Sequence, residues 1–124
     1  MSKIHSHRDL HVYQLAFSAA IDIYEFSKNF PKEETYSMTD QIRRSSRSVA
    51  ANLSEAWRKR RYEKAFIAKL SDVESEAAET QVWLELAMAC GYISEEEFET
   101  YFDKYEHIIS MVIRMIAEPK KWSI

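Results

Sequence analysis

The scarcity of turn-forming residues limits what this chain can fold into. Its 124 residues include one glycine and two prolines, whereas β-hairpins and β-sandwiches need such residues at their many turns. Hydrophobic residues make up 46% of the chain and aromatic residues 13%, which is far more than a disordered chain carries. The composition therefore predicts a few long helices around one hydrophobic core, in a single domain that spans residues 1–124.

Start and stop signals divide this domain into four predicted helices, at residues 9–29, 38–60, 62–90 and 95–117. Ser37 or Thr39 can cap the second helix with its hydroxyl oxygen. Gly91 can end the third helix in a left-handed conformation, and Ser94 with Glu97 forms a capping box for the fourth. Short loops between helices of similar length favour antiparallel neighbours. We therefore expect an all-α, antiparallel, up-and-down four-helix bundle.

An apolar stripe runs along the first predicted helix at the i, i+3, i+4 spacing of a buried face. Its members are Leu10, Tyr13, Phe17, Ala20, Ile21 and Tyr24. The second predicted helix has a comparable stripe that includes Ile42, Val49, Leu53 and Ala56. We expect both stripes to face the core of the bundle.

Two opposed blocks of charge lie behind the near-neutral total of −3. Residues 41–70 hold nine basic and two acidic residues, a net charge of +7, and residues 71–106 hold eleven acidic residues against Lys104 alone. Because salt screens charges beyond about 10 Å, a local basic stripe acts largely independently of the total. The layout predicts either a docking surface for phosphate or a pair of complementary subunit faces.

Arginines form a stripe on the second predicted helix, opposite its apolar face, when residues are placed at about 100° intervals. Only the small residues Ala51 and Ser54 interrupt the stripe, so a phosphate chain or another helix can approach closely. The planar fork of arginine suits bidentate contacts with phosphate or carboxylate. The predicted nucleic-acid-binding residues are Arg43, Arg44, Arg47, Arg58, Lys59, Arg60 and Arg61.

Three interpretations of this arginine stripe stay open at the sequence level. It can dock on the phosphate backbone of RNA or DNA, form a solvated face with scattered ion pairs, or contact the acidic side of another subunit. Asp72, Glu76 and Glu79 line up at i, i+4 and i+7 as such an acidic side. No motif that reads base edges is present, so any nucleic-acid binding should be led by the backbone and weakly sequence-specific.

A polar group is predicted at the edge of the core. Asn52 lies beside the apolar stripe of its helix, where an unpaired buried amide costs about 1–3 kcal/mol. Thr80 and Gln81 fall at similar depth on the third predicted helix and can pair with it. Together with Glu55 these residues are interpreted as a structural polar network, with ligand binding as the alternative.

The sequence offers no convincing catalytic or metal-binding pattern. None of the four histidines has an acidic residue three positions before it, as a ferritin-type di-iron site needs. One glycine cannot make a glycine-rich phosphate loop, and no nucleophile elbow is present. His5, His7 and His11 can gather a metal, but we interpret them as a solvated tail. We expect no enzymatic activity, no metal and no cofactor.

Several features indicate a cytoplasmic protein. Cys90 is the only cysteine, which excludes an internal disulfide and fits a reducing compartment. No apolar run approaches the roughly 18 residues that span a bilayer, and the amino-terminal residues lack the apolar region of a signal peptide. We therefore expect no membrane association.

Residues 40–58, DQIRRSSRSVAANLSEAWR, resemble a family of bacterial four-helix-bundle proteins encoded in intervening sequences of 23S ribosomal RNA genes. Further segments support this resemblance in the expected order: DLHVY at 9–13, FPKEE at 30–34, ETQVWL at 79–84 and CGYI at 90–93. Two positions depart from the family pattern. Ala50 replaces a usual proline, which predicts a straighter helix, and Ala56 stands where many relatives have glycine.

The resemblance implies a bundle that assembles into a ring, most often a homopentamer, without enzymatic activity. The chain is also similar to the accessory protein of diversity-generating retroelements, a barrel-shaped pentamer that engages nucleic acid and a reverse transcriptase. A protein client is therefore a further expectation. By position, the resemblance carries over the arginines at 43, 44, 47 and 58 as a binding surface and the Asn52–Glu55 pair as structural. The alternative function is a protein–protein scaffold whose arginines serve subunit contacts.

Overall fold

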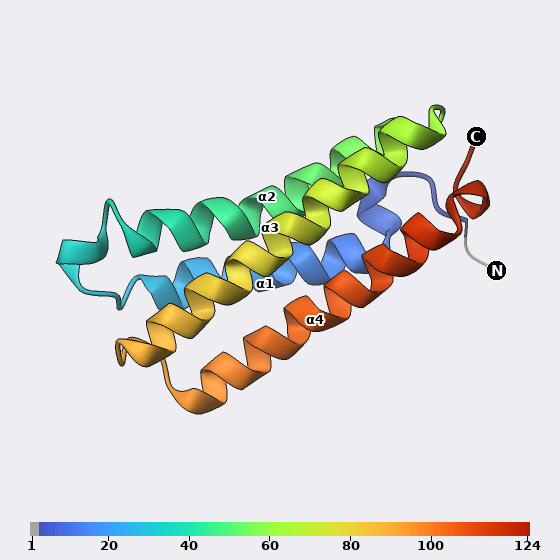
Figure 1. Ribbon diagram of the computed structural model, residues 1–124. Helices are drawn as coiled ribbons and strands as arrows, with labels where there is room; N and C mark the ends of the chain where they lie inside the picture. Colours follow the sequence, from blue (N-terminus) through green and yellow to red (C-terminus); the bar gives the residue numbers. More distant parts are fainter. Residues whose placement is uncertain (1–2) are drawn as a thin grey trace.

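Four α-helices run in antiparallel, up-and-down order in the computed structural model, which describes residues 3–124 (Figure 1). The helices are α1 (His11–Ser27), α2 (Met38–Arg58), α3 (Glu63–Ala89) and α4 (Glu95–Ala117). Three short 3-10 helices accompany them: η1 (His7–Asp9), η2 (Lys32–Glu34) and η3 (Pro119–Lys121). The predicted fold class is confirmed, and each predicted helix end lies within two residues of the observed one.

Each α-helix packs against two others, so the four surround one core. α1 contacts α2 and α4, and α3 contacts the same two helices from the opposite corner of the bundle. The predicted inward face of α2 is confirmed, because Ile42, Val49 and Leu53 are almost completely buried. α2 is one continuous α-helix through Ala50, the position where the family usually has proline. Within residues 3–124, no helix is both long and apolar enough to cross a membrane.

The predicted inward face of the first helix is wrong. α1 buries Val12, Ala16, Ala19 and Ile23, whereas three large members of the predicted stripe are exposed to solvent. The exposed fractions are 51% for Phe17, 48% for Ile21 and 36% for Tyr24. Two apolar stripes with the same spacing lie about 100° apart on this helix. The stripe with small residues faces inward because it lets α1 pack closely against its neighbours.

Two of the predicted helix ends have the expected local chemistry. Gly91 has a φ of +79°, the left-handed conformation predicted after the third helix. Ser94 and Glu97 form the capping box of α4: the Glu97 N–H donates to Ser94 Oγ, and the Ser94 N–H donates to Glu97 Oε1, both at 3.0 Å. These ends were predictable because each depends on residues a few positions apart.

The start of α2 differs from the prediction. Ser37 occupies the N-cap position, but neither its hydroxyl nor that of Thr39 caps the helix. Instead the Met38 N–H donates to Glu34 Oε1 at 3.2 Å. Glu34 also accepts a hydrogen bond of 2.8 Å from the Tyr92 hydroxyl, so one carboxylate joins the α1–α2 loop to the α3–α4 loop. We call this end of the bundle, which holds both loops, the loop end.

Candidate nucleic-acid interface

Four exposed cations gather where α2 turns into α3, at the opposite end of the bundle from the two loops (Figure 1). We call this set the basic corner: Arg58, Lys59, Arg61 and Lys64. Within residues 3–124, none of the ion pairs or side-chain hydrogen bonds involves these four side chains. Arg58 and Lys59 line a shallow depression together with Tyr62, which is exposed. The corner therefore presents unpaired positive charge to solvent.

A carboxylate beside the basic corner is already paired. Glu55 lines the same depression as Arg58, but its Oε1 lies 3.6 Å from the Nζ of Lys69 on α3. The same Nζ lies 3.4 Å from Asp72 Oδ2, and Lys69 is half-buried. Lys69 thus joins α2 to α3 and draws both carboxylates away from the corner. Glu55 was predicted to join a polar network with Asn52, Thr80 and Gln81, and its contact in the structure is this ion pair with Lys69 instead.

Arg60 belongs to the structure rather than to the exposed corner, although sequence reasoning grouped it with its neighbours. Its guanidinium lies 3.3 Å from the centre of the Trp57 ring. Its Nε donates to the Trp57 carbonyl at 2.7 Å, and Nη1 donates to the Trp122 carbonyl at 3.5 Å. Burial lowers the pKa of Arg60, and the charge of Arg58 adds to this effect. Arg60 therefore caps a carbonyl in the last turn of α2 and holds the carboxy-terminal segment.

The first arginines of the predicted stripe turn toward α1. Arg43 Nε donates to Ser27 Oγ at 2.8 Å, and its guanidinium lies 4.9 Å from the centre of the Tyr24 ring. The guanidinium of Arg47 lies 5.8 Å from the same ring. Arg44 points elsewhere and forms an exposed ion pair of 3.9 Å with Asp40. The stripe predicted from the sequence is thus divided among three environments.

The four residues predicted as one polar network are not hydrogen-bonded to one another within residues 3–124, and three of them have other partners. Thr80 Oγ1 lies 2.9 Å from Ser45 Oγ, which links α3 to α2 inside the core. Gln81 Nε2 donates to the Phe102 carbonyl at 3.3 Å and to Glu106 Oε2 at 3.2 Å, which links α3 to α4. The predicted pairing of Thr80 and Gln81 with Asn52 is therefore wrong, because Thr80 pairs with Ser45 on α2 and Gln81 reaches α4. Asn52 itself is half-buried.

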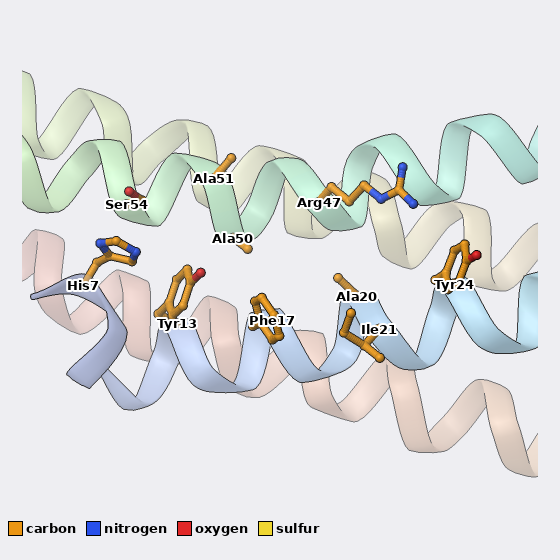
Figure 2. A pocket seen from close by; sticks show the side chains of 10 residues that line it. All are labelled: His7, Tyr13, Phe17, Ala20, Ile21, Tyr24, Arg47, Ala50, Ala51 and Ser54. Carbon is orange, nitrogen blue, oxygen red and sulfur yellow. The ribbon is translucent and has the colours of Figure 1, made fainter.

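Sequence reasoning missed an open apolar groove between α1 and α2 (Figure 2). One wall is the exposed stripe of α1, and the other is made of small residues and Arg47 on α2. The groove measures about 580 Å³ and is lined by His7, Tyr13, Phe17, Ala20, Ile21, Tyr24, Arg47, Ala50, Ala51 and Ser54. The signal was present in the sequence as a second apolar stripe and as the small residues between arginines.

The fold and the basic corner together describe a small all-α bundle with a cluster of exposed cations at one end. The chain belongs to the 23S rRNA-intervening sequence protein family, whose model matches residues 8–114. It is similar to a crystal structure of a protein of unknown function from the S23 ribosomal protein family of Bacteroides thetaiotaomicron. The two chains are 32% identical with a TM-score of 0.77, over 86% of this chain and 95% of the other. No curated protein matches the chain.

Proposed function

We propose that this protein is a cytoplasmic, non-enzymatic, homo-oligomeric bundle that binds the phosphate backbone of RNA or DNA through its basic corner. The observation that supports this proposal is the set of four exposed cations without carboxylate partners among the described residues. The family resemblance adds a ring of subunits, most often five, and a protein client. Within the predicted arginine set, we assign binding to Arg58, Lys59 and Arg61 and a structural role to Arg43 and Arg60.

The physical case rests on which cations are available. An exposed Lys or Arg that meets a phosphate releases condensed counterions, and this release supplies most of the affinity of non-specific binding. Arg44 must first give up Asp40, and Arg43 must give up Ser27 and Tyr24. Arg58 and Arg61 give up only water. The corner should therefore dominate binding, with weak sequence preference because it only contacts the backbone.

The alternative function is a protein–protein scaffold without nucleic-acid binding. The apolar groove with Arg47 on its rim favours this function, because such a surface suits a protein partner. A protein partner in the groove would leave Arg58 and Lys59 uncovered, so occupancy of the groove does not by itself distinguish the two functions. They differ in whether purified protein binds nucleic acid at all.

Fluorescence anisotropy across a salt series tests the proposal with a structured RNA and a DNA duplex. Binding should weaken linearly in a log–log plot of affinity against salt. An Arg58/Lys59/Arg61 triple alanine variant should lower the slope for duplex DNA by roughly 0.9 for each phosphate that it no longer neutralises. The matched control is Arg44→Ala, which removes an exposed but ion-paired arginine and should leave the affinity nearly unchanged. Absence of binding at low salt would overturn the proposal in favour of the scaffold.

A further inference from the structure

The groove between α1 and α2 has the character of an unoccupied helix-packing surface. Phe17, Ile21 and Tyr24 lie in a row along α1, and the small Ala51 and Ser54 line the groove from α2 (Figure 2). η1 packs against both helices and places His7 at one end of the groove. Large exposed apolar side chains on one wall and small ones on the other form a trough that fits a rounded helical ridge.

The charges around this groove are basic. Arg47 and His7 line it, and its ten lining residues include no carboxylate. Arg8 lies just beyond, in a shallow depression that shares Tyr13 and Phe17 with the groove. A partner that fits the trough should therefore bring an apolar surface with acidic residues on its flanks.

The same chain has such a surface on α3. Four exposed apolar residues follow one another at i, i+4, i+8 and i+11 and form what we call the α3 ridge: Ala78, Val82, Leu86 and Ala89. Val82 is 51% exposed and Leu86 is 41% exposed. Glu79 and Glu85 are also exposed and lie about 60° to either side of Val82 around the helix. Residues 71–103 contain no lysine or arginine.

The groove and the ridge cannot meet within one molecule. The ridge projects from α3 into solvent, and α3 packs against α2 and α4 but not against α1. Two different surfaces of one chain that complement each other make a head-to-tail contact between copies. Such a contact generates a closed ring if the rotation between subunits closes, and an open filament otherwise.

We propose that the α1–α2 groove receives the α3 ridge of a second copy of this chain. This inference rests on the proposed homo-oligomer and names the two surfaces that build it. Apolar side chains of the ridge cover the α1 stripe, while Glu79 and Glu85 approach the arginines at the rim, Arg47 and Arg8. The groove side of α2 is thus used between subunits, and the basic corner stays available to nucleic acid.

A mixing experiment tests the head-to-tail contact. Ile21→Asp places a charge in the groove, and Val82→Asp places one on the ridge; both positions are exposed, so each variant should keep its fold by circular dichroism. Light scattering after size exclusion should show an oligomer for the wild-type protein and a monomer for each variant. A mixture should give a 1:1 heterodimer, because one chain keeps its ridge and the other its groove.

The matched control is Ile113→Asp on α4. Ile113 is 48% exposed, the same fraction as Ile21, but it lies in neither the groove nor the ridge. This variant should remain oligomeric. A monomeric wild-type protein, an unchanged oligomer in Ile21→Asp, or a Val82→Asp oligomer of wild-type size would each overturn the inference. So would a mixture that stays monomeric.

Nucleic-acid binding is measured separately on the same proteins. If the mixture forms the heterodimer but no protein binds RNA or DNA, the basic-corner proposal fails and the groove–ridge contact stands. If the monomeric Ile21→Asp and Val82→Asp variants bind nucleic acid but do not pair, the contact fails and the basic corner stands. A monomeric wild-type protein would leave the groove for a client protein instead of a second copy.

Discussion

Both ends of α2 carry arginines, but the arginine at one end contacts α1 and the arginine at the other end is exposed to solvent. At the loop end, Arg43 is hydrogen-bonded to Ser27 and covers the ring of Tyr24 on α1. At the basic corner, Arg58 and Arg61 are exposed, and no ion pair within residues 3–124 involves them. The helix face alone does not determine what an arginine does. The neighbouring element decides, since an aromatic ring of α1 lies beside one end and solvent beside the other.

Charge reversal at the basic corner should have the largest effect, and the property that changes should be the affinity for nucleic acid. An Arg58→Glu/Arg61→Glu variant should lose at least about 100-fold in affinity for duplex DNA at low salt, because two attractive phosphate contacts become repulsive. Its free energy of unfolding should stay within about 0.5 kcal/mol of the wild-type value, as for other surface substitutions. Anisotropy titration and urea denaturation provide the two measurements. Equal affinity for variant and wild type would show that the corner is not the binding surface.

Removal of Arg60 should lower the stability of the protein and leave its affinity for nucleic acid nearly unchanged. Arg60→Ala loses hydrogen bonds to the Trp57 and Trp122 carbonyls and the contact with the Trp57 ring. We expect a loss of about 1–3 kcal/mol in the free energy of unfolding and a small change in affinity. Urea denaturation followed by circular dichroism measures the loss, and Arg61→Ala is the matched control. Equal stability of the two variants would contradict the structural role of Arg60.

Removal of Arg43 should produce a smaller change at the loop end. Arg43→Ala loses a hydrogen bond to Ser27 Oγ, a longer one to the Tyr24 carbonyl and the contact with the Tyr24 ring, together worth about 1 kcal/mol. Arg47→Ala loses only the more distant approach to Tyr24 and should change the unfolding free energy of the monomer by less. Both variants are best compared in the Ile21→Asp background, where assembly does not contribute. A larger loss for Arg47→Ala would reverse the assignment.

The smallest expected effect is a pH dependence at the loop end. Hydrogen bonds from the Tyr92 hydroxyl and then the Met38 N–H lower the pKa of Glu34 below its usual value of 4.5. This carboxylate therefore adds stability above that pH and loses it as pH falls through the lowered pKa. Tyr92→Phe should flatten the stability profile as pH falls below 4.5, as measured by thermal unfolding. If the stability of Tyr92→Phe falls with acid as steeply as that of the wild-type protein, the contact between Tyr92 and Glu34 is not the source of the acid sensitivity.

The same hydrogen bond should make stability fall at alkaline pH, because it raises the pKa of Tyr92 while it lowers that of Glu34. The hydrogen bond to Glu34 raises the pKa of Tyr92 to about 12 from 10.0. The contact should therefore persist up to about pH 10 and weaken as pH rises toward 12. Ultraviolet absorbance of tyrosinate in a Glu34→Gln variant, compared with the wild-type protein, reports whether Glu34 holds the proton on Tyr92.

Helix positions and helix ends could be predicted because they depend on local chemistry. Gly91 and the Ser94–Glu97 box lie within a few residues of the ends they define, and Pro119 follows α4 closely. The cap of α2 could not be predicted in the same way, since Glu34 reaches Met38 from a separate 3-10 helix and also binds Tyr92, 58 positions away. Only the folded chain brings these groups together.

The buried face of α1 and the roles of the arginines lay beyond sequence reasoning for a different reason. Both apolar stripes of α1 have helical spacing, so periodicity alone could not distinguish the face with Ala16 and Ala19 from the face with Phe17 and Ile21. The larger side chains suggested the wrong buried face, because close packing between helices favoured the face with the smaller residues. Arg60 looked like its neighbours in the sequence, and its partner Trp122 lies 62 positions away.

The two stripes of α1 also divide the stability of the protein between two sources. The stripe with Ala16, Ala19 and Ile23 is buried in every folded chain, so its contribution is the same at any dilution. The stripe with Phe17 and Ile21 leaves water only when another molecule covers it, so its contribution follows mass action. With a second copy in the groove, as proposed above, the melting temperature should rise with protein concentration until the groove is saturated. One face of α1 stabilises the chain itself, and under the proposed groove–ridge contact the other face would make stability depend on protein concentration.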